Sequence, residues 1–228
     1  MSFTYTKIEQ EEEASTPVLS LPIPPQQIIE PLPRLDESMQ FQNVQYITSG
    51  THANIYKVEL PNEETGETVV LCLKIFKRNA MLPYELETEA YEYLAHHGVY
   101  YWIPRVYGTA VRTPAQWGLD KVDGDEEGEY HGILMEWIEG GEWLSQDNLS
   151  ADHVVSFVRG LVRIHDAGVF HNDSENQNML VVPGSDRAVW IDFSCARVDA
   201  TDEDKDHEME YGATHPVLMV RLLELSGA

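Results

Sequence analysis

The stretch HNDSENQN at residues 171–178, followed by DFS at residues 192–194, decides the fold that we expect for this chain. It places Asp173 five residues before Asn178. A short hairpin around a Pro-Gly-Ser turn is expected between the two stretches, because each side of the turn is apolar and prone to form a strand. The pattern therefore predicts a site that contains two carboxylates and one side-chain amide.

Phosphoryl transfer needs such a set of side chains. The spacing His-x-Asp-x-x-x-x-Asn resembles the catalytic loop of the protein-kinase-like superfamily, and Asp-Phe-Ser stands where that superfamily has Asp-Phe-Gly. The resemblance implies that Asp173 orients the hydroxyl of the acceptor and that Asn178 and Asp192 bind Mg²⁺. It also implies that His171 has a structural role and braces the loop near Asp192.

A metal site formed by His165, His171 and Asp173 is an alternative interpretation of the same stretch, because imidazoles and carboxylates are common ligands of zinc. We favour the first interpretation, because a metal site of this kind leaves Asn178 and Asp192 without an explanation.

A strand is expected over residues 68–76, and Lys74 lies within it between Leu73 and Ile75. A cation on a buried strand is costly unless it is paired. Residues 72–74 resemble the end of the Val-Ala-Ile-Lys strand of the superfamily, whose lysine grips the α- and β-phosphates of ATP. The simpler alternative is a lysine whose ammonium group reaches solvent.

A helix is expected over residues 84–97, opened by Pro83 and closed by Gly98. In the superfamily, a carboxylate of this helix pairs with the strand lysine. The family pattern selects Glu87, and Glu89 is the second choice. The other carboxylates of the helix are expected to lie on a solvated face.

The resemblance also implies a nucleotide site. The glycine-rich loop of the superfamily falls on residues 48–53, where Gly50 is the only glycine at the three expected positions. Residues near the end of a predicted strand over 132–138 resemble the hinge of the superfamily. There, adenine would bond to backbone groups near Glu136 and Ile138.

The fold expected is therefore α+β, a two-lobed protein-kinase-like fold with a β-rich N-lobe and a reduced, mainly helical C-lobe. Proline-rich and acidic residues 1–40 are expected to form a disordered or loosely packed tail. The kinase-like domain would span residues 41–228, with the N-lobe over 41–135, the hinge over 136–141 and the C-lobe over 142–228.

Other elements follow from apolar periodicity. Ser150 is expected to cap an amphipathic helix that ends before Gly168. Strands are expected at 44–48, 55–60 and 103–109, with the hairpin strands at 179–182 and 188–191. An acidic loop over 198–207 and a closing helix over 215–225 complete the expected order.

The chain of 228 residues carries a formal charge of −24, which disfavours nucleic acid and anionic membranes as partners. The two cysteines, Cys72 and Cys195, do not make a disulfide framework, so a reducing compartment is expected. Residues 1–15 have no apolar core of a signal peptide, and no apolar run approaches the roughly 18 residues of a membrane helix. We therefore expect a soluble protein of the cytoplasm or the nucleus.

The resemblance covers residues 41–198 and departs from the superfamily at three points. Glu175 stands where protein kinases usually have a lysine, Ser194 replaces the glycine after Asp-Phe, and only 34 residues follow Ser194. The leading hypothesis is a phosphotransferase that uses ATP and Mg²⁺ to phosphorylate a hydroxyl of a protein or a small molecule. The alternative is a catalytically impaired pseudokinase that acts as a nucleotide-binding or scaffold module.

The acidic segments themselves suggest a further hypothesis. The tail and the loop over 121–130 would attract a basic partner. The simpler explanation, which we favour, is that their charge keeps the protein in solution.

Overall fold

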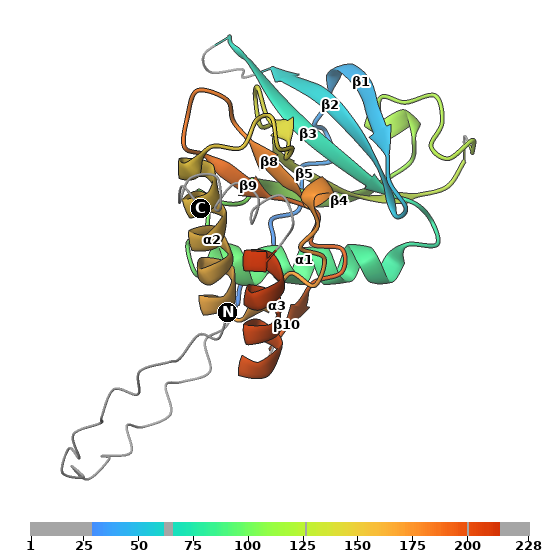
Figure 1. Cartoon of the computed structure of the whole chain (residues 1–228). Coiled ribbons are helices and arrows are strands. Elements are labelled where there is room, and N and C mark those ends of the chain that lie inside the picture. Colours follow the sequence, from blue (N-terminus) through green and yellow to red (C-terminus); the bar gives the residue numbers. More distant parts are fainter. Residues whose placement is uncertain (1–28, 62–65, 126, 200, 215–228) are drawn as a thin grey trace, which may run out of the picture.

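A computed structural model describes residues 29–61, 66–125, 127–199 and 201–214 of the chain. These residues form a mixed α+β structure with three α-helices and ten strands, which confirms the predicted class (Figure 1). None of the described helices has the length and apolarity needed to cross a membrane. The helix expected at 215–225 and residues 1–28 of the predicted tail lie outside the described residues.

The largest sheet has five antiparallel strands in the order β1-β2-β3-β5-β4. Strand β3 occupies the predicted residues, and the other four begin or end within three residues of the prediction. Two smaller antiparallel sheets have the orders β10-β7 and β6-β8-β9. The strands of the large sheet are β1 (Gln42–Ser49), β2 (Ala53–Pro61), β3 (Thr68–Phe76), β4 (Val106–Arg112) and β5 (Tyr130–Glu136).

The two faces of β3 contribute to two different hydrophobic clusters, as its alternating sequence predicts. Leu71, Leu73 and Ile75 pack in a cluster with Trp117 on one side of the sheet. Phe76 belongs to the larger cluster on the other side, where helix α1 (Met81–His96) also packs. Because Lys74 alternates with Leu73 and Ile75, its side chain projects toward the helix.

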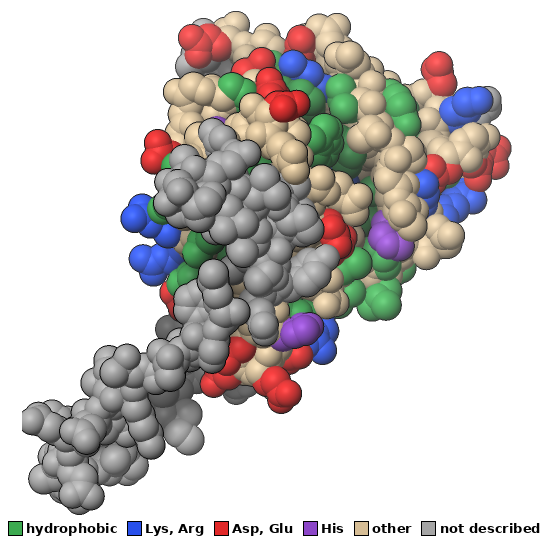
Figure 2. Space-filling model, in the orientation of Figure 1, with side chains coloured by type: hydrophobic (Ala, Val, Ile, Leu, Met, Phe, Trp, Pro, Cys, Tyr) green, Lys and Arg blue, Asp and Glu red, His purple; other side chains and the backbone are tan. Residues whose placement is uncertain are grey.

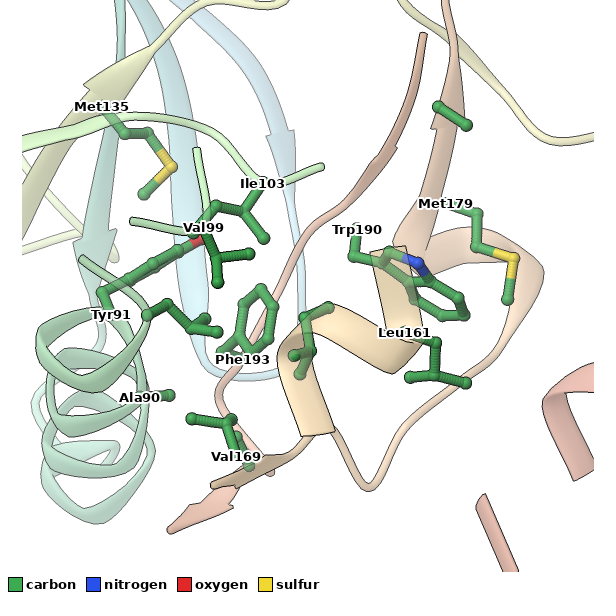
Figure 3. Close-up of a cluster of buried hydrophobic side chains, with 14 of the residues drawn as sticks. Ala90, Tyr91, Val99, Ile103, Met135, Leu161, Val169, Met179, Trp190 and Phe193 are labelled. Atoms are coloured by element: carbon green, nitrogen blue, oxygen red, sulfur yellow. The ribbon is translucent and has the colours of Figure 1, made fainter. Parts of the chain in front are cut away.

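Helix α1 begins three residues before the predicted start, so Pro83 lies in its first turn. A proline is tolerated there because its missing N–H would have no partner within the helix. Gly98 follows the end of the helix with φ of 69°, a left-handed conformation that glycine adopts without strain. Figure 3 shows Ala90 and Tyr91 of this helix facing the larger cluster.

Helix α2 (Ala151–Asp166) has the predicted cap. The side chain of Ser150 accepts a hydrogen bond from the backbone N–H of His153 at 3.1 Å, and His153 Nδ1 accepts one from the N–H of Ser150 at 3.2 Å. Helix α2 packs against β9 (Ala188–Trp190), which forms a hairpin with β8 (Met179–Val181). Three two-residue strands are β6 (Glu142–Trp143), β7 (Val169–Phe170) and β10 (Arg197–Val198).

Helix α3 (Asp202–Thr214) occupies part of the segment that we expected to be an acidic loop, so that expectation is wrong. Thr201 and Asp204 cap its start, because each backbone N–H donates to the side chain of the other residue. The acidic first turn is favourable, since negative charge stabilises the N-terminus of a helix. The capping pair is visible in the sequence, but the apolar periodicity on which we relied is weak here.

Residues 30–40, which the sequence analysis assigned to the tail, pack along the edge of the large sheet. The backbone N–H of Leu35 donates to Thr109 O, and the N–H of Thr109 donates to Pro33 O, both at 2.9 Å. Leu32 and Leu35 are 9% exposed. The packed chain therefore begins before residue 41, because a proline without an N–H can still offer its carbonyl to an edge strand.

On the face that Figure 2 shows, acidic side chains lie at several separate places. The guanidinium group of Arg112 is buried beside Trp117 and donates to the backbone oxygens of Asp36 and Met39. It therefore fastens residues 36–39 to the sheet.

The cap of α2 gives a testable prediction. Ser150→Ala removes an acceptor of the first turn and should destabilise the fold by about 1 kcal/mol. For a domain of this size the thermal midpoint should fall by roughly 2–4 °C. Ser150→Asp keeps a capping oxygen and should stay within about 1 °C of the native chain. Equal losses in the two variants would contradict a capping role.

Candidate active site

Lys74 is paired with two carboxylates that come from distant parts of the chain. Its Nζ lies 2.5 Å from Glu87 Oε2 on α1 and 2.8 Å from Asp192 Oδ1 after β9. Lys74 and Glu87 are 5% and 1% exposed, so this is a buried ion-pair cluster and not a lysine that reaches solvent. The structure thus selects Glu87, and Glu89 is exposed.

Burial and pairing shift the pKa values of the three groups in different ways. Burial alone would lower the pKa of Lys74, but the two carboxylates raise it, so the ammonium stays charged. Burial alone would raise the pKa of Asp192, but Lys74 and a hydrogen bond from Ser194 hold it well below its usual value. Burial raises the pKa of Glu87 to about 7, because Lys74 offsets only part of the desolvation and Asp192 repels a second negative charge.

The end of the β8–β9 hairpin brings the other predicted residues together. Met179 pairs with Trp190, and the N–H of Ile191 donates to Asn178 O at 3.0 Å, so Asn178 and Asp192 leave the hairpin at the same end. The amide nitrogen of Asn178 donates to Asp173 Oδ2 at 2.7 Å and to Asp173 O at 2.9 Å. Because its nitrogen faces Asp173, the amide oxygen of Asn178 is the atom left for a cation.

His171 and Phe193 support this end of the hairpin from the core. His171 is fully buried and its Nε2 donates to Ile191 O at 3.0 Å. Burial lowers the pKa of His171, so the ring stays neutral and packs on Phe193 with 4.5 Å between the ring centroids. Phe193 packs in turn on Tyr91 of α1, with 5.2 Å between the ring centroids. Figure 3 shows both side chains in the larger cluster. His171 therefore contacts the residues on either side of Asp192, Ile191 and Phe193, in the region where we expected it to brace the loop.

Two residues of the site have left-handed backbone conformations. Asn172 has φ of 61° and Asp192 has φ of 62°. Such conformations cost free energy in residues other than glycine, and they persist where the surroundings hold them. Lys74 and Ser194 hold the side chain of Asp192, and Asn172 Nδ2 donates to Cys195 O at 3.1 Å.

Glu208 of α3 holds the loop that carries Asp173, and sequence analysis missed it. Its carboxylate accepts hydrogen bonds from the backbone N–H of His171 at 3.0 Å and of Asn172 at 2.6 Å. It also contacts Ser174 Oγ at 2.8 Å and His165 Nε2 at 2.7 Å. These bonds hold the pKa of Glu208 below its usual value, although burial alone would raise it. No motif marked this residue, which lies just after the segment 198–207 that we expected to be an acidic loop.

The alternative metal site is not formed. His165 Nε2 contacts Glu208, and His171 Nε2 donates to the backbone, so neither nitrogen is directed at Asp173. Within the described ranges, no three His, Cys, Asp or Glu side chains converge as a metal site.

The residues expected to bind a nucleotide lie at turns and strand ends of the large sheet. The N–H of Gly50 donates to Ala53 O, and Lys77 Nζ donates to Gly50 O, both at 2.8 Å. The side chain of Glu136 forms a two-pronged ion pair with Arg187, at 2.7 and 2.9 Å. Ile138 is buried, and its carbonyl accepts a bond from Gly141 N. No hydrogen bond or ion pair joins Gly50, Glu136 or Ile138 to Lys74.

Comparison with known proteins adds no assignment. No protein-family model matches this chain, and no curated protein matches its sequence.

The acceptor role of Glu208 gives a second prediction. Glu208→Gln weakens four hydrogen bonds of a buried carboxylate and should cost about 2–4 kcal/mol of stability. The midpoint of thermal unfolding should fall by roughly 5–15 °C. Glu203→Gln changes an exposed carboxylate of the same helix and should cost less than about 1 kcal/mol. Equal stability of the two variants would contradict the claim that the hydrogen bonds of Glu208 stabilise the fold.

The raised pKa of Glu87 gives a third prediction, about pH. Its pKa rises from 4.5 to about 7 on folding, so the folded chain binds this proton more tightly than the unfolded chain. The stability that results is fully present below pH 4.5 and is lost as the pH rises through 7.

The measurement is denaturant unfolding of the native chain and of Glu87→Gln at pH 5.5 and at pH 8. The free energy of unfolding of the native chain, minus that of the variant, should fall by about 2 kcal/mol between these values. Groups that lie far from Glu87 cancel in this difference. An increase with pH would mean that pairing with Lys74 lowers the pKa of Glu87.

Proposed function

We propose that this protein is a phosphotransferase that uses ATP and Mg²⁺ to phosphorylate a hydroxyl group, and that it has a two-lobed protein-kinase-like fold. The observation that carries the proposal is the buried pair of Lys74 and Glu87 together with the part-exposed carboxylate of Asp192. A lysine with only a structural role needs no such arrangement, because burial of an ammonium group costs desolvation free energy that an exposed lysine avoids. A lysine fixed beside an open carboxylate suits the binding of phosphate groups.

The arrangement of elements supports this proposal. The five-stranded sheet and α1 come first in the chain, and α2, α3 and the small sheets come last. Residues 137–141 connect β5 to β6 between these two groups, where the proposed hinge lies. The Glu136–Arg187 ion pair joins the end of β5 to the β8–β9 hairpin beside this connection.

The side chains at the end of the β8–β9 hairpin fit a magnesium ion. Mg²⁺ prefers oxygen ligands and is usually bound by one or two carboxylates together with substrate phosphates. Asp192 supplies a carboxylate that stays ionised, and Asn178 supplies an amide oxygen. When bound, the ion would neutralise negative charge on the phosphates.

Three residues of the protein would have separate roles in the reaction. Lys74 would hold the phosphates of ATP while Glu87 keeps its ammonium group in place. Asp173 is half-buried, and one of its carboxylate oxygens is held by Asn178. The other oxygen would accept a hydrogen bond from the hydroxyl of the acceptor and orient it for attack. Catalysis would rest on positioning and charge rather than on covalent chemistry.

A second candidate function is a pseudokinase that binds nucleotide or a partner without turnover. Glu175 favours it, because a negative charge near the transferred phosphate opposes the reaction where protein kinases usually have a lysine. The turn at residues 48–53 favours it too, since it offers one glycine where the superfamily has three. The retained set of Asp173, Asn178 and Asp192 favours the enzyme.

Thermal unfolding with ATP, with and without Mg²⁺, tests nucleotide binding. Saturation at about one hundred times the dissociation constant adds roughly 2.7 kcal/mol, which is a rise of several degrees. The rise should depend on Mg²⁺ and be lost in Asp192→Asn. Asp166→Asn, an exposed carboxylate of α2, should keep it. Absence of any rise at millimolar ATP would rule out the assembled nucleotide site.

Turnover distinguishes the enzyme from the pseudokinase. Asp173→Asn should lower phosphoryl transfer by at least about 100-fold, because it removes the carboxylate that orients the hydroxyl. The shift of the midpoint by ATP and Mg²⁺ should survive in this variant. The measurement is transfer of labelled phosphate to a panel of hydroxyl compounds and proteins. Transfer at the native rate in Asp173→Asn would contradict the assignment.

A further inference from the structure

Residues 30–40, which we call the N-terminal strap, cross the edge of the large sheet at β4 and reach both of its sides. Leu32 belongs to the larger hydrophobic cluster, which also contains Tyr91 of α1. Leu35 belongs to the cluster on the other side of the sheet, with Trp117. The strap therefore connects the side of the sheet that α1 covers to the opposite side.

The backbone of β4 is shaped to receive the strap. A Cβ atom at Gly108 would lie 2.5 Å from Pro33 O and 2.9 Å from Leu35 Cδ2. Such contacts are too short for any Cβ atom, so glycine alone lets the two backbones approach this closely. The two hydrogen bonds between the strap and the backbone of Thr109 fix the register. The strap thus has one defined position on the sheet.

The strap also binds α1 directly. The backbone N–H of Leu32 donates to Glu92 Oε1 at 3.0 Å. Glu92 lies on α1, five residues after Glu87. At the other end of the strap, two backbone oxygens accept hydrogen bonds from Arg112. The strap is therefore fastened to the sheet at one end and to α1 at the other.

The position of Glu87 needs such support from outside its own turn of the helix. Helix α1 follows Ala80, whose side chain cannot cap it, and its first turn has no acidic residue. Glu87 loses its hydration when it reaches Lys74, and burial raises the pKa of Glu87 to about 7. Because this desolvation opposes the ion pair, other contacts of α1 must hold the carboxylate in place.

We propose that the N-terminal strap is a positioning segment, which holds α1 against the large sheet so that Glu87 reaches Lys74. Leu32 and Glu92 are its positioning residues, because they join the strap to the helix. The effect of the strap on the ion pair does not depend on catalysis. Its effect on nucleotide binding rests on the function proposed above, in which Lys74 holds the phosphates.

Hydrogen exchange of the full chain, followed by mass spectrometry, tests whether the strap holds α1. Leu35→Ala is a matched control for Leu32→Ala, because both leucines belong to the strap and are 9% exposed. In Leu32→Ala, the amides of α1 should exchange about tenfold faster relative to those of β3. In Leu35→Ala, this ratio should change by less than about twofold. Equal ratios in the two variants would overturn the proposal.

A second pair of variants tests the hydrogen bond and does not require Leu32→Ala to fold. Glu92→Ala removes the acceptor of the Leu32 N–H, and Glu85→Ala removes an exposed carboxylate of the same helix. The first should speed exchange of α1 relative to β3 by about three- to fivefold, and the second by less than about twofold. Equal exchange of α1 in these two variants would contradict the role of Glu92.

A double-mutant cycle tests the link between the strap and Glu87. The loss of thermal midpoint caused by Glu87→Ala is measured in the native chain, in Leu32→Ala and in Leu35→Ala. The loss should shrink by at least about half in Leu32→Ala, because the ion pair is already weakened there, and stay within about 1 °C of the native loss in Leu35→Ala. Equal losses in all three backgrounds would overturn the proposal, since a purely structural strap gives additive effects.

Nucleotide binding supplies the last readout. The rise of the midpoint with ATP and Mg²⁺ should fall by about half or more in Leu32→Ala and remain native in Leu35→Ala. A full rise in Leu32→Ala would overturn the link between the strap and the nucleotide site. Absence of a rise in the native chain would contradict the proposed function alone, because hydrogen exchange and the cycle decide the role of the strap without nucleotide.

Discussion

The buried ion-pair cluster of Lys74 is the interaction on which the rest of the structure depends. An unpaired ammonium group inside this core would cost several kcal/mol, so the fold is favourable only when its carboxylates are in place. Those carboxylates lie on α1 and after β9, while the lysine lies on β3. The cluster therefore fixes the position of α1 against the large sheet and ties the end of the β8–β9 hairpin to both.

A second buried carboxylate, that of Glu208, fixes the position of the loop that carries Asp173. Its four hydrogen bonds fasten α3 to the end of α2 and to the start of the loop. Asn172 keeps a left-handed backbone within this arrangement. The carboxylates of Glu208 and Asp192 thus stabilise the two backbone segments that meet beside Asn178.

The sequence predicted much of this site from particular residues. The alternation of β3 assigned Lys74 to the face opposite Leu73 and Ile75, and the two hydrophobic clusters confirm it. Resemblance to a known family selected Glu87 over its neighbours on α1. Glu208 and the packed segment 30–40 were missed. Both depend on partners that lie tens of residues away, such as His171 and Thr109, and local patterns carry no information on such contacts.

The sequence by itself determined which chemistry is available. It set the spacing of Asp173, Asn178 and Asp192, the cap at Ser150 and the strand around Lys74, because these features arise within one element or one turn. Only the tertiary structure decided that Asp192 joins Glu87 in pairing with Lys74 and that Glu208 holds the Asp173 loop. These depend on distances between separate elements, which close packing of the core fixes and local sequence does not.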